Sequence, residues 1–253
     1  MGSLKGKRAL VTGAAHGIGR AIAEDLIKAG CDVFIHYHER DEGLQDLLDL
    51  AQSLSQRAGS FSADLTVEDQ AVDCVAKAVG FLGGLEALVN NTGGMVARRL
   101  IGEIDRDFWQ KAMDVNMTTM MLVTREAVPH LAEAGGASIV NNASLAGRKG
   151  GHGGSLAYAT SKGAVLTWTR ALATELVPRG IRVNAVAPGL ILGTLFHGTF
   201  TTKESAEATI AAIPLGRAGN VYDVSRAVVF LASEYDGFIT GETIDINGGV
   251  YCA

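Results

Sequence analysis

The sequence predicts a single-domain α/β protein with a doubly wound parallel sheet of about seven strands and helices on both faces. Short aliphatic or β-branched runs alternate with longer amphipathic stretches along all 253 residues. This alternation favours parallel strands joined by right-handed helical crossovers. The composition agrees, because 47% hydrophobic and 19% charged residues suit a large core. No repeat, low-complexity tract or linker divides residues 1–253.

The first half of the chain gives this pattern most clearly. The run RALVT is aliphatic and predicts a strand, and the stretch after it carries apolar residues at helical spacing. Thr66 is the expected N-cap of the third helix, because its hydroxyl can accept from a free N–H of the first turn. In order, the expected elements are a strand at 8–12, a helix at 17–29, a strand at 32–37, a helix at 43–57, a weak strand at 59–64, a helix at 66–81 and a strand at 85–91.

The second half continues the alternation with one interruption. The expected elements are a helix at 105–133, a strand at 137–144, a helix at 155–178, a strand at 181–187, a helix at 220–233 and a strand at 241–246. The whole set predicts a Rossmann-type arrangement. The long segment after the sixth strand interrupts the rhythm, and we expect a substrate lid at about 190–213. A plain surface excursion is the alternative interpretation.

Charge and cysteine content exclude several classes of function. The net charge is −5 and no basic run stands out, so nucleic acid is not an expected partner. The three cysteines, Cys31, Cys74 and Cys252, form no C-x-x-C pair, which favours free thiols in a reducing compartment. We see no signal peptide, no apolar run of the ~18 residues that a membrane span needs, and no cluster typical of a metal site. The expectation is a cytoplasmic protein without a membrane or metal partner.

A glycine-rich turn joins the first strand to the first helix. In VTGAAHGIGRA, Gly13, Gly17 and Gly19 would let the chain turn sharply and let a pyrophosphate approach the helix N-terminus, with His16 and Ile18 beside it. The spacing departs from G-x-G-x-x-G. A turn that uses glycine only for steric reasons is therefore the alternative.

The end of the second strand is expected to approach the adenosine ribose. An acidic residue there would hold the ribose hydroxyls of NAD and repel a 2′-phosphate, but this position holds Tyr37, with His36 and His38 beside it. We therefore expect NADP as the preferred cofactor and keep NAD as a possibility. Asp64 and Leu65, at the end of the third strand, are expected near the adenine.

The segment YATSK places Tyr158 and Lys162 four residues apart, on one face of an expected helix. A phenol has a pKa near ~10, which is high for proton exchange at neutral pH. A nearby ammonium favours the phenolate, so we expect Lys162 to lower the pKa of Tyr158. Tyr158 is then a candidate general acid and base.

Several further segments accompany this pair in a fixed order. They are TGAAHGIG, NNTGG at 90–94, DVNMTT at 114–119, NNASLAG at 141–147, VNAVAPG at 183–189 and TGETIDINGG at 240–249. Each is weak alone, but together the sequence resembles the short-chain dehydrogenase/reductase family over nearly its full length. Within that likeness Thr92 replaces an alanine, and the segment between Ser144 and Tyr158 is slightly long.

The resemblance implies both a catalytic set and a cofactor site. The implied catalytic residues are Asn116, Ser144, Tyr158 and Lys162. In the family the asparagine supports a water that connects the lysine to solvent, and the lysine holds the nicotinamide ribose. The implied cofactor contacts beyond those named above are Asn91, Gly93, Tyr158, Lys162, Pro188, Gly189 and Ile191. Thr194 comes one place after the position, occupied by Gly193, where the family often has a threonine for the carboxamide.

The expected function is NADP(H)-dependent interconversion of a ketone and a secondary alcohol, with a small carbonyl or alcohol as substrate. A 3-oxoacyl-acyl-carrier-protein reductase, a sugar or polyol dehydrogenase, and a catalytically silent nucleotide-binding protein are the alternatives. No sequence spacing links His152 or His197 to the implied catalytic residues. Apolar residues around the helices at 105–133 and 155–178 predict a contact with a second subunit. With the resemblance, which implies pairing through these two helices, we expect a homotetramer, with a homodimer as fallback.

Overall fold

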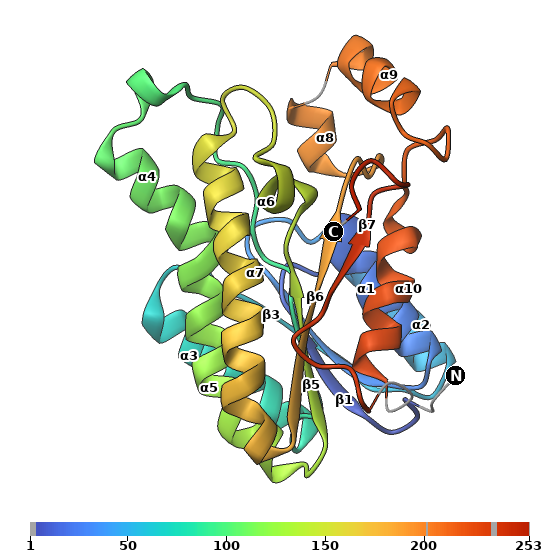
Figure 1. Cartoon of the computed structure of the whole chain (residues 1–253). Coiled ribbons are helices and arrows are strands. Elements are labelled where there is room, and N and C mark those ends of the chain that lie inside the picture. The colour runs from blue at the N-terminus through green and yellow to red at the C-terminus, as the bar shows by residue number, and fades with distance from the viewer. Residues whose placement is uncertain (1–3, 201, 234–236, 253) are drawn as a thin grey trace.

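The computed structural model describes residues 4–200, 202–233 and 237–252. Its centre is one sheet of seven parallel strands in the order β3-β2-β1-β4-β5-β6-β7, which confirms the predicted fold class (Figure 1). The strands are β1 (Arg8–Val11), β2 (Asp32–Tyr37), β3 (Ala58–Ser62), β4 (Ala87–Asn90), β5 (Ala137–Asn142), β6 (Ile181–Pro188) and β7 (Thr243–Ile246).

Helices cover both faces of this sheet and bury two apolar layers (Figure 1). One face is covered by α1 (Gly17–Lys28), α2 (Leu44–Ser53) and α10 (Val221–Ala232). The other is covered by α3 (Glu68–Leu82), α5 (Thr119–Glu133) and α7 (Leu156–Leu176). The remaining helices are α4 (Arg106–Met113), α6 (Leu145–Lys149), α8 (Leu195–Phe200), α9 (Lys203–Ala211), and the short 3-10 turns η1 (Ile101–Glu103) and η3 (Val177–Arg179).

Two local predictions need correction, and one short helix was not predicted. The helix expected at 43–57 ends at Ser53, because Ser55 adopts a left-handed conformation with φ of 59°. Thr66 is not an N-cap: its hydroxyl donates to Oδ1 of Asp64 at 2.7 Å, and Val67 precedes α3. The Gly-rich segment after β5 forms the short helix α6, which periodicity did not reveal.

The helix expected at 105–133 is interrupted by a π-helical turn, η2 (Asp114–Thr118). A π turn inserts one extra residue into the helix, and such insertions often occur at functional sites. Asn116 lies in this turn and is fully buried. The apolar pattern on either side continues at helical spacing, so the sequence alone showed one long helix.

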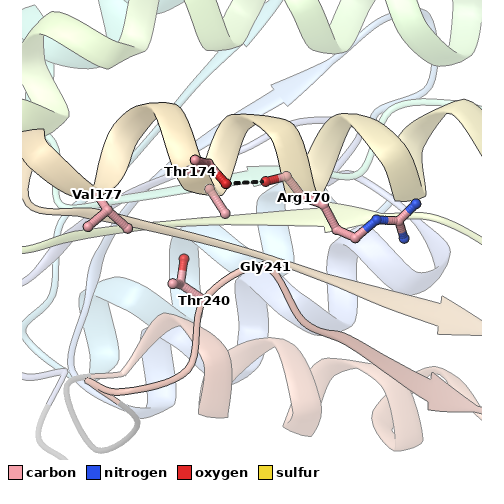
Figure 2. Close-up of a pocket in the computed structure, with 6 residues that line it drawn as sticks. Arg170, Thr174, Val177, Thr240 and Gly241 are labelled. Carbon is pink, nitrogen blue, oxygen red and sulfur yellow. Dashed lines mark hydrogen bonds between the residues drawn. The ribbon is translucent and has the colours of Figure 1, made fainter.

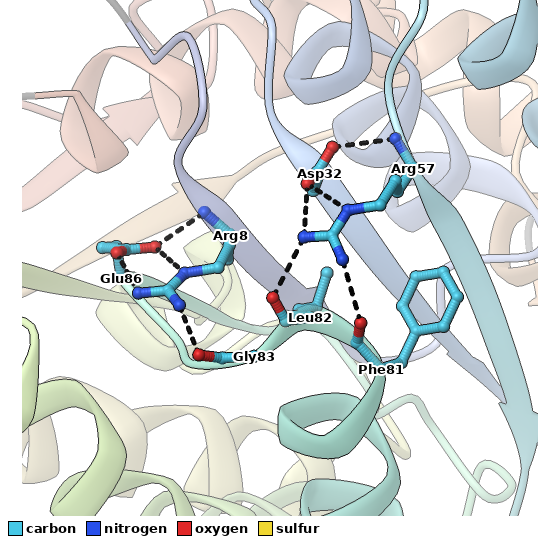
Figure 3. Close-up of polar contacts among 7 residues, drawn as sticks. All are labelled: Arg8, Asp32, Arg57, Phe81, Leu82, Gly83 and Glu86. Atoms are coloured by element: carbon cyan, nitrogen blue, oxygen red, sulfur yellow. Dashed lines mark hydrogen bonds and ion pairs between the residues drawn. The ribbon is translucent and has the colours of Figure 1, made fainter.

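Ion pairs close the amino end of the sheet (Figure 3). Nε of Arg8 donates to Oε2 of Glu86 at 2.8 Å, and a further nitrogen of the same guanidinium contacts the other carboxylate oxygen. Arg57 pairs with Asp32 at 2.7 Å and donates to the carbonyls of two residues at the end of α3. Two arginine–carboxylate pairs thus lie at this end of the sheet.

The segment at 189–214 crosses the carboxyl ends of the strands as α8 and α9 (Figure 1). The side chains of residues 195–197, including the one at His197, lie outside the described residues. Across the described part of the chain, the helices are all too short or too polar to cross a membrane.

Candidate active site

The predicted site residues gather where β1, β4 and β5 end. β1 has β2 on one side and β4 on the other, so the connections leave these strands in opposite directions. Ligands in open α/β sheets bind at such a switch point, outside the carboxyl ends of the strands. The glycine turn follows β1, Asn91 follows β4, and Ser144 follows β5.

The glycine turn has the geometry of an anion cradle. Gly13 and Gly17 have φ of 61° and 58°. A Cβ on Gly19 would lie 2.1 Å from the carbonyl oxygen of Gly13, so only glycine fits there. His16, at the N-cap of α1, makes no side-chain cap bond, which leaves the N–H groups of the first turn to an external anion. Ile18 packs against the core under the turn.

Asn91 fixes this turn from the neighbouring strand. Its Nδ2 donates to the carbonyls of Thr12 and Gly13 at 3.0 and 2.9 Å, and its Oδ1 accepts from Nδ2 of Asn142 at 2.9 Å. Within the described residues, Oγ1 of Thr92 and Oδ1 of Asn142 are buried without a hydrogen-bond partner. Unsatisfied buried oxygens beside a glycine cradle fit a site that receives a polar ligand such as a dinucleotide.

His36 is hydrogen-bonded to the glycine turn, a role that the sequence did not predict. The side chain is 1% exposed, accepts from the N–H of Gly13 at 3.1 Å through Nδ1, and donates from Nε2 to the carbonyl of Ala63 at 3.0 Å. Burial lowers the pKa of His36 to about 4. The imidazole is therefore neutral at pH 7 and does not offer a charge to a 2′-phosphate.

The positions expected around the adenosine lie at the ends of β2 and β3. Tyr37 is half-buried, while His38 and Arg40 are exposed. The pKa of His16 is lowered by partial burial and then by the charge of Arg40, so these two side chains share one region. Asp64 accepts from the N–H and hydroxyl of Thr66 at 3.0 and 2.7 Å, and Leu65 is buried. The carboxylate of Asp64 thus shapes a turn within the chain.

Ser144 and Tyr158 come together through their hydroxyls. Ser144 is the N-cap of α6, where its Oγ accepts from the N–H of Ala146 at 3.1 Å. Its side chain is also hydrogen-bonded to the phenol of Tyr158. Burial raises the pKa of Tyr158, and the bond to Ser144 opposes that rise. The net direction is upward and Lys162 is not among its causes, so the structure does not show the expected lowering of this pKa by Lys162.

Lys162 lies in the same helix as Tyr158, and its ammonium is bonded to the backbone. Nζ donates to the carbonyl of Asn142 at 2.7 Å, and the side chain is 3% exposed. Burial lowers the pKa of Lys162 to about 8. The low polarity that disfavours the phenolate of Tyr158 also disfavours the ammonium of Lys162, which explains both shifts.

Asn116 and Gly93 complete this cluster. A Cβ on Gly93, whose φ is 149°, would lie 2.7 Å from Oδ1 of Asn116 and 3.2 Å from Nζ of Lys162. The Asn116 amide donates to the carbonyls of Gly94 and Ala112 at 3.0 and 2.9 Å, and its Oδ1 accepts from the N–H of Gly94 at 3.0 Å. The π turn thus ties the loop after β4 to the lysine of α7.

The strand β6 supplies the far wall of the site. Pro188 pairs with β7 and Gly189 donates to the carbonyl of Ile246 at 2.9 Å, whereas Ile191 is buried in the core. The Thr194 hydroxyl donates to the carbonyl of Ile191 at 3.2 Å, and its methyl carbon lies 3.9 Å from the Cβ position of Gly17. Thr194 therefore reaches the glycine turn although it is one place late in the sequence. His152 is exposed in the loop before α7.

A hollow between α7 and the turn before β7 lies at the other end of α7 (Figure 2). Its lining consists of Arg170, Ala173, Thr174, Val177, Thr240 and Gly241. The one ionisable group among them is Arg170, so this hollow offers no acid–base pair. The described residues also contain no group of three or more His, Cys, Asp or Glu side chains that could hold a metal ion.

Comparison with known proteins agrees with this geometry. Residues 13–251 match the family model described as enoyl-(acyl carrier protein) reductase. An uncharacterized oxidoreductase of Methylorubrum extorquens is 37% identical over 99% of this chain and 100% of its own. A 3-oxoacyl-acyl-carrier-protein reductase of Vibrio cholerae is 34% identical over 98% of this chain and 99% of its own. The crystal structure of an NADH-dependent reductase responsible for alginate metabolism superposes with a TM-score of 0.90 at 32% identity, covering 99% of both chains.

Proposed function

We propose that this chain, which belongs to the short-chain dehydrogenase/reductase family and is an NAD(P)-dependent oxidoreductase, interconverts a ketone and a secondary alcohol with NADP(H). The observation that carries the proposal is the hydrogen bond between Ser144 and Tyr158, with Lys162 buried in the same helix. NADP(H) would supply or accept the hydride. The chain's own task is to orient the carbonyl and to move one proton.

Tyr158 is the proposed proton donor. Its raised pKa keeps the phenol protonated at neutral pH, so the proton to be donated to a ketone oxygen is present. Ser144 is placed to hydrogen-bond the same oxygen as negative charge develops there. Lys162 would hold the nicotinamide ribose, and Asn116 would support the water that returns a proton to it.

The cofactor would lie along the glycine cradle and the ends of β2 and β3. The glycine turn would face the pyrophosphate, with Tyr37 and His38 at the adenosine ribose and Asp64 near the adenine. NADP is preferred because the end of β2 carries no acid at Tyr37, and Arg40 is exposed beside His16. The NADH-dependent reductase of similar fold is an argument for the alternative, NAD.

Cofactor choice is tested by comparing oxidation of NADPH and NADH with a panel of ketones. We expect the wild type to have the higher kcat/KM with NADPH. Tyr37→Asp should move the preference toward NADH by about tenfold or more, since its carboxylate would repel the 2′-phosphate. Tyr37→Phe is the matched control, because it adds no charge. A wild type that prefers NADH would contradict the cofactor assignment.

The same panel separates the alternative functions. A 3-oxoacyl-acyl-carrier-protein reductase is favoured by the Vibrio cholerae relative and would reduce 3-oxoacyl thioesters best. A sugar or polyol dehydrogenase would prefer hydroxylated substrates. A silent nucleotide-binding protein would bind NADPH without oxidising it, but such a protein has no need for the phenol of Tyr158.

We further propose a homotetramer with twofold symmetry in the cytoplasm, with a homodimer as fallback. Met117 in the π turn and Trp168 in α7 are only partly buried against a small core cluster, which leaves apolar surface for a subunit contact. Light scattering at micromolar concentration would show a mass four or two times 26.4 kDa. A monomer mass would reject this assembly without affecting the proposed reaction.

A further inference from the structure

Arg98 connects three segments that surround the site. It lies in the loop between β4 and η1, and its side chain is exposed. Nη1 donates to the carbonyl of Gly153 at 3.0 Å, and Nη2 donates to the carbonyl of Phe200 at 3.1 Å. Gly153 belongs to the loop before α7, and Phe200 is the last residue of α8. One guanidinium thus joins the loop after β4, the loop before Tyr158 and the lid.

The loop before α7 is fitted closely to this arginine. A Cβ on Gly154, whose φ is 76°, would lie 2.9 Å from Cβ of Arg98. The N–H of Arg99 donates to the carbonyl of Gly154 at 3.0 Å. The Gly-rich segment between Ser144 and Tyr158 is therefore anchored on the backbone that carries Arg98. That contact gives the glycine at position 154 a structural reason.

The other end of α8 starts at the glycine turn, where Thr194 approaches Gly17. The helix therefore runs from the proposed pyrophosphate site to the loop that precedes Tyr158. Its two ends are held differently: the first is continuous with β6 through Ile191, whereas Arg98 holds the last residue by a side-chain contact. An exposed hydrogen bond to a neutral carbonyl contributes little net stability, so it can break and re-form easily.

We propose that Arg98 is a positioning residue that fastens the end of α8 to the loop before Tyr158 and so holds the lid over the substrate entrance. The kinetic consequences of this inference rest on the proposed function, whereas the hydrogen bonds of Arg98 do not depend on it. Substrate would enter when the bond to Phe200 opens, and closing would restore it. Removing the guanidinium deletes its hydrogen bonds to the carbonyls of Gly153 and Phe200 and shifts the lid toward the open form.

The test compares Arg98→Gln, Arg98→Lys and the wild type by amide hydrogen exchange across α8 and α9 and by steady-state kinetics. Arg98→Gln should exchange about tenfold faster in α8, the scale of losing one or two modest hydrogen bonds. KM for a neutral ketone should rise about fivefold while kcat changes less than about twofold, because loss of lid closure weakens binding more than chemistry. Arg98→Lys, which can reach only one carbonyl at a time, should fall between.

Arg99→Gln is the matched control, since it removes the same charge from the same loop. Arg99 pairs with Asp105 at 2.9 Å and stacks over Phe108 at 4.4 Å, away from α8. Unchanged exchange in Arg98→Gln, or equal acceleration in Arg99→Gln, would overturn the proposal. A defect confined to acidic ketones with normal exchange would also overturn it and would make Arg98 an anion-binding residue instead. Amide hydrogen exchange is measured without turnover, so this test remains valid if the protein proves catalytically silent and the proposed function fails.

Discussion

The two ends of the same sheet differ in how their charged and polar groups are satisfied. At the amino end, Arg8 and Arg57 satisfy two carboxylates and the last carbonyls of α3 (Figure 3). At the carboxyl end, the buried ammonium of Lys162 donates to a carbonyl rather than to a carboxylate, and Oγ1 of Thr92 has no hydrogen-bond partner among the described residues. Satisfied charges stabilise a fold, whereas strained or unsatisfied groups mark a site shaped for a ligand.

The pKa values of the ionisable groups at the two ends show the same contrast. At the amino end, partial burial opposes ionisation of Glu86, yet hydrogen bonds from Arg8 hold its pKa below the usual value. At the carboxyl end, burial dominates and shifts the pKa values of Tyr158 and Lys162 toward their neutral forms. The nucleotide proposed to bind at the carboxyl end would change the surroundings there. The difference predicts which substitutions affect turnover and which affect stability.

The largest effect is expected from Gly19→Ala at the glycine turn. Its Cβ would lie 2.1 Å from the Gly13 carbonyl and 2.5 Å from Nδ2 of Asn91, so the turn must move. We expect the affinity for NADPH, measured by fluorescence titration, to fall by roughly 10²-fold or more, since the anion cradle is lost. Gly80→Ala in α3 is the control, because its Cβ meets nothing within 4 Å. Equal affinity in both variants would contradict the cradle.

The second-largest effect is expected in the pH dependence of ketone reduction. Lys162 has a pKa of about 8 in the folded protein and an ordinary value of 10.5. Ketone reduction should therefore decline above pH 8, by about tenfold per pH unit, as the ammonium is lost. Between these pKa values the unfolded chain binds more protons, so the contribution of Lys162 to stability rises with pH. A rate that stays flat to pH 10 would contradict this.

The smallest effect is expected from Arg57→Gln at the amino end. The side chain is 54% exposed, so loss of its pair with Asp32 should lower the free energy of unfolding by only about 1 kcal/mol. The value of kcat/KM should remain that of the wild type. Urea unfolding and a turnover assay on the same preparation check both statements. A clear loss of turnover would mean that the two ends are coupled.

Sequence reasoning identified the elements but not the way in which they meet. Short aliphatic or β-branched runs located all seven strands, and the resemblance carried by the order of short motifs grouped Ser144, Tyr158 and Lys162 as one catalytic set. The π turn around Asn116 was missed because one inserted residue leaves the apolar spacing on both sides intact. His36 was missed because a histidine inside a strand gives no sign of its burial or partners.

The direction of the Tyr158 shift could not be predicted for a related reason. Spacing of four residues places Lys162 on the same helix face, but whether attraction or burial dominates depends on where Nζ points. In the structure Nζ is bonded to the carbonyl of Asn142, and burial prevails. The role of Arg98 likewise depends on residues more than fifty positions away, at Gly153 and Phe200.

The central claim is that the carboxyl end of the sheet serves turnover and the amino end serves stability. It is tested by comparing Tyr158→Phe with Arg8→Gln in two assays, turnover of a ketone with NADPH and urea unfolding. Tyr158→Phe should lower kcat by roughly 10²-fold or more through loss of proton donation, while unfolding changes by less than about 1 kcal/mol. Arg8→Gln should lower the free energy of unfolding by about 2 kcal/mol, because it breaks a charge-assisted pair, and leave kcat unchanged. Near-normal turnover in Tyr158→Phe, or lost turnover in folded Arg8→Gln, would contradict that claim.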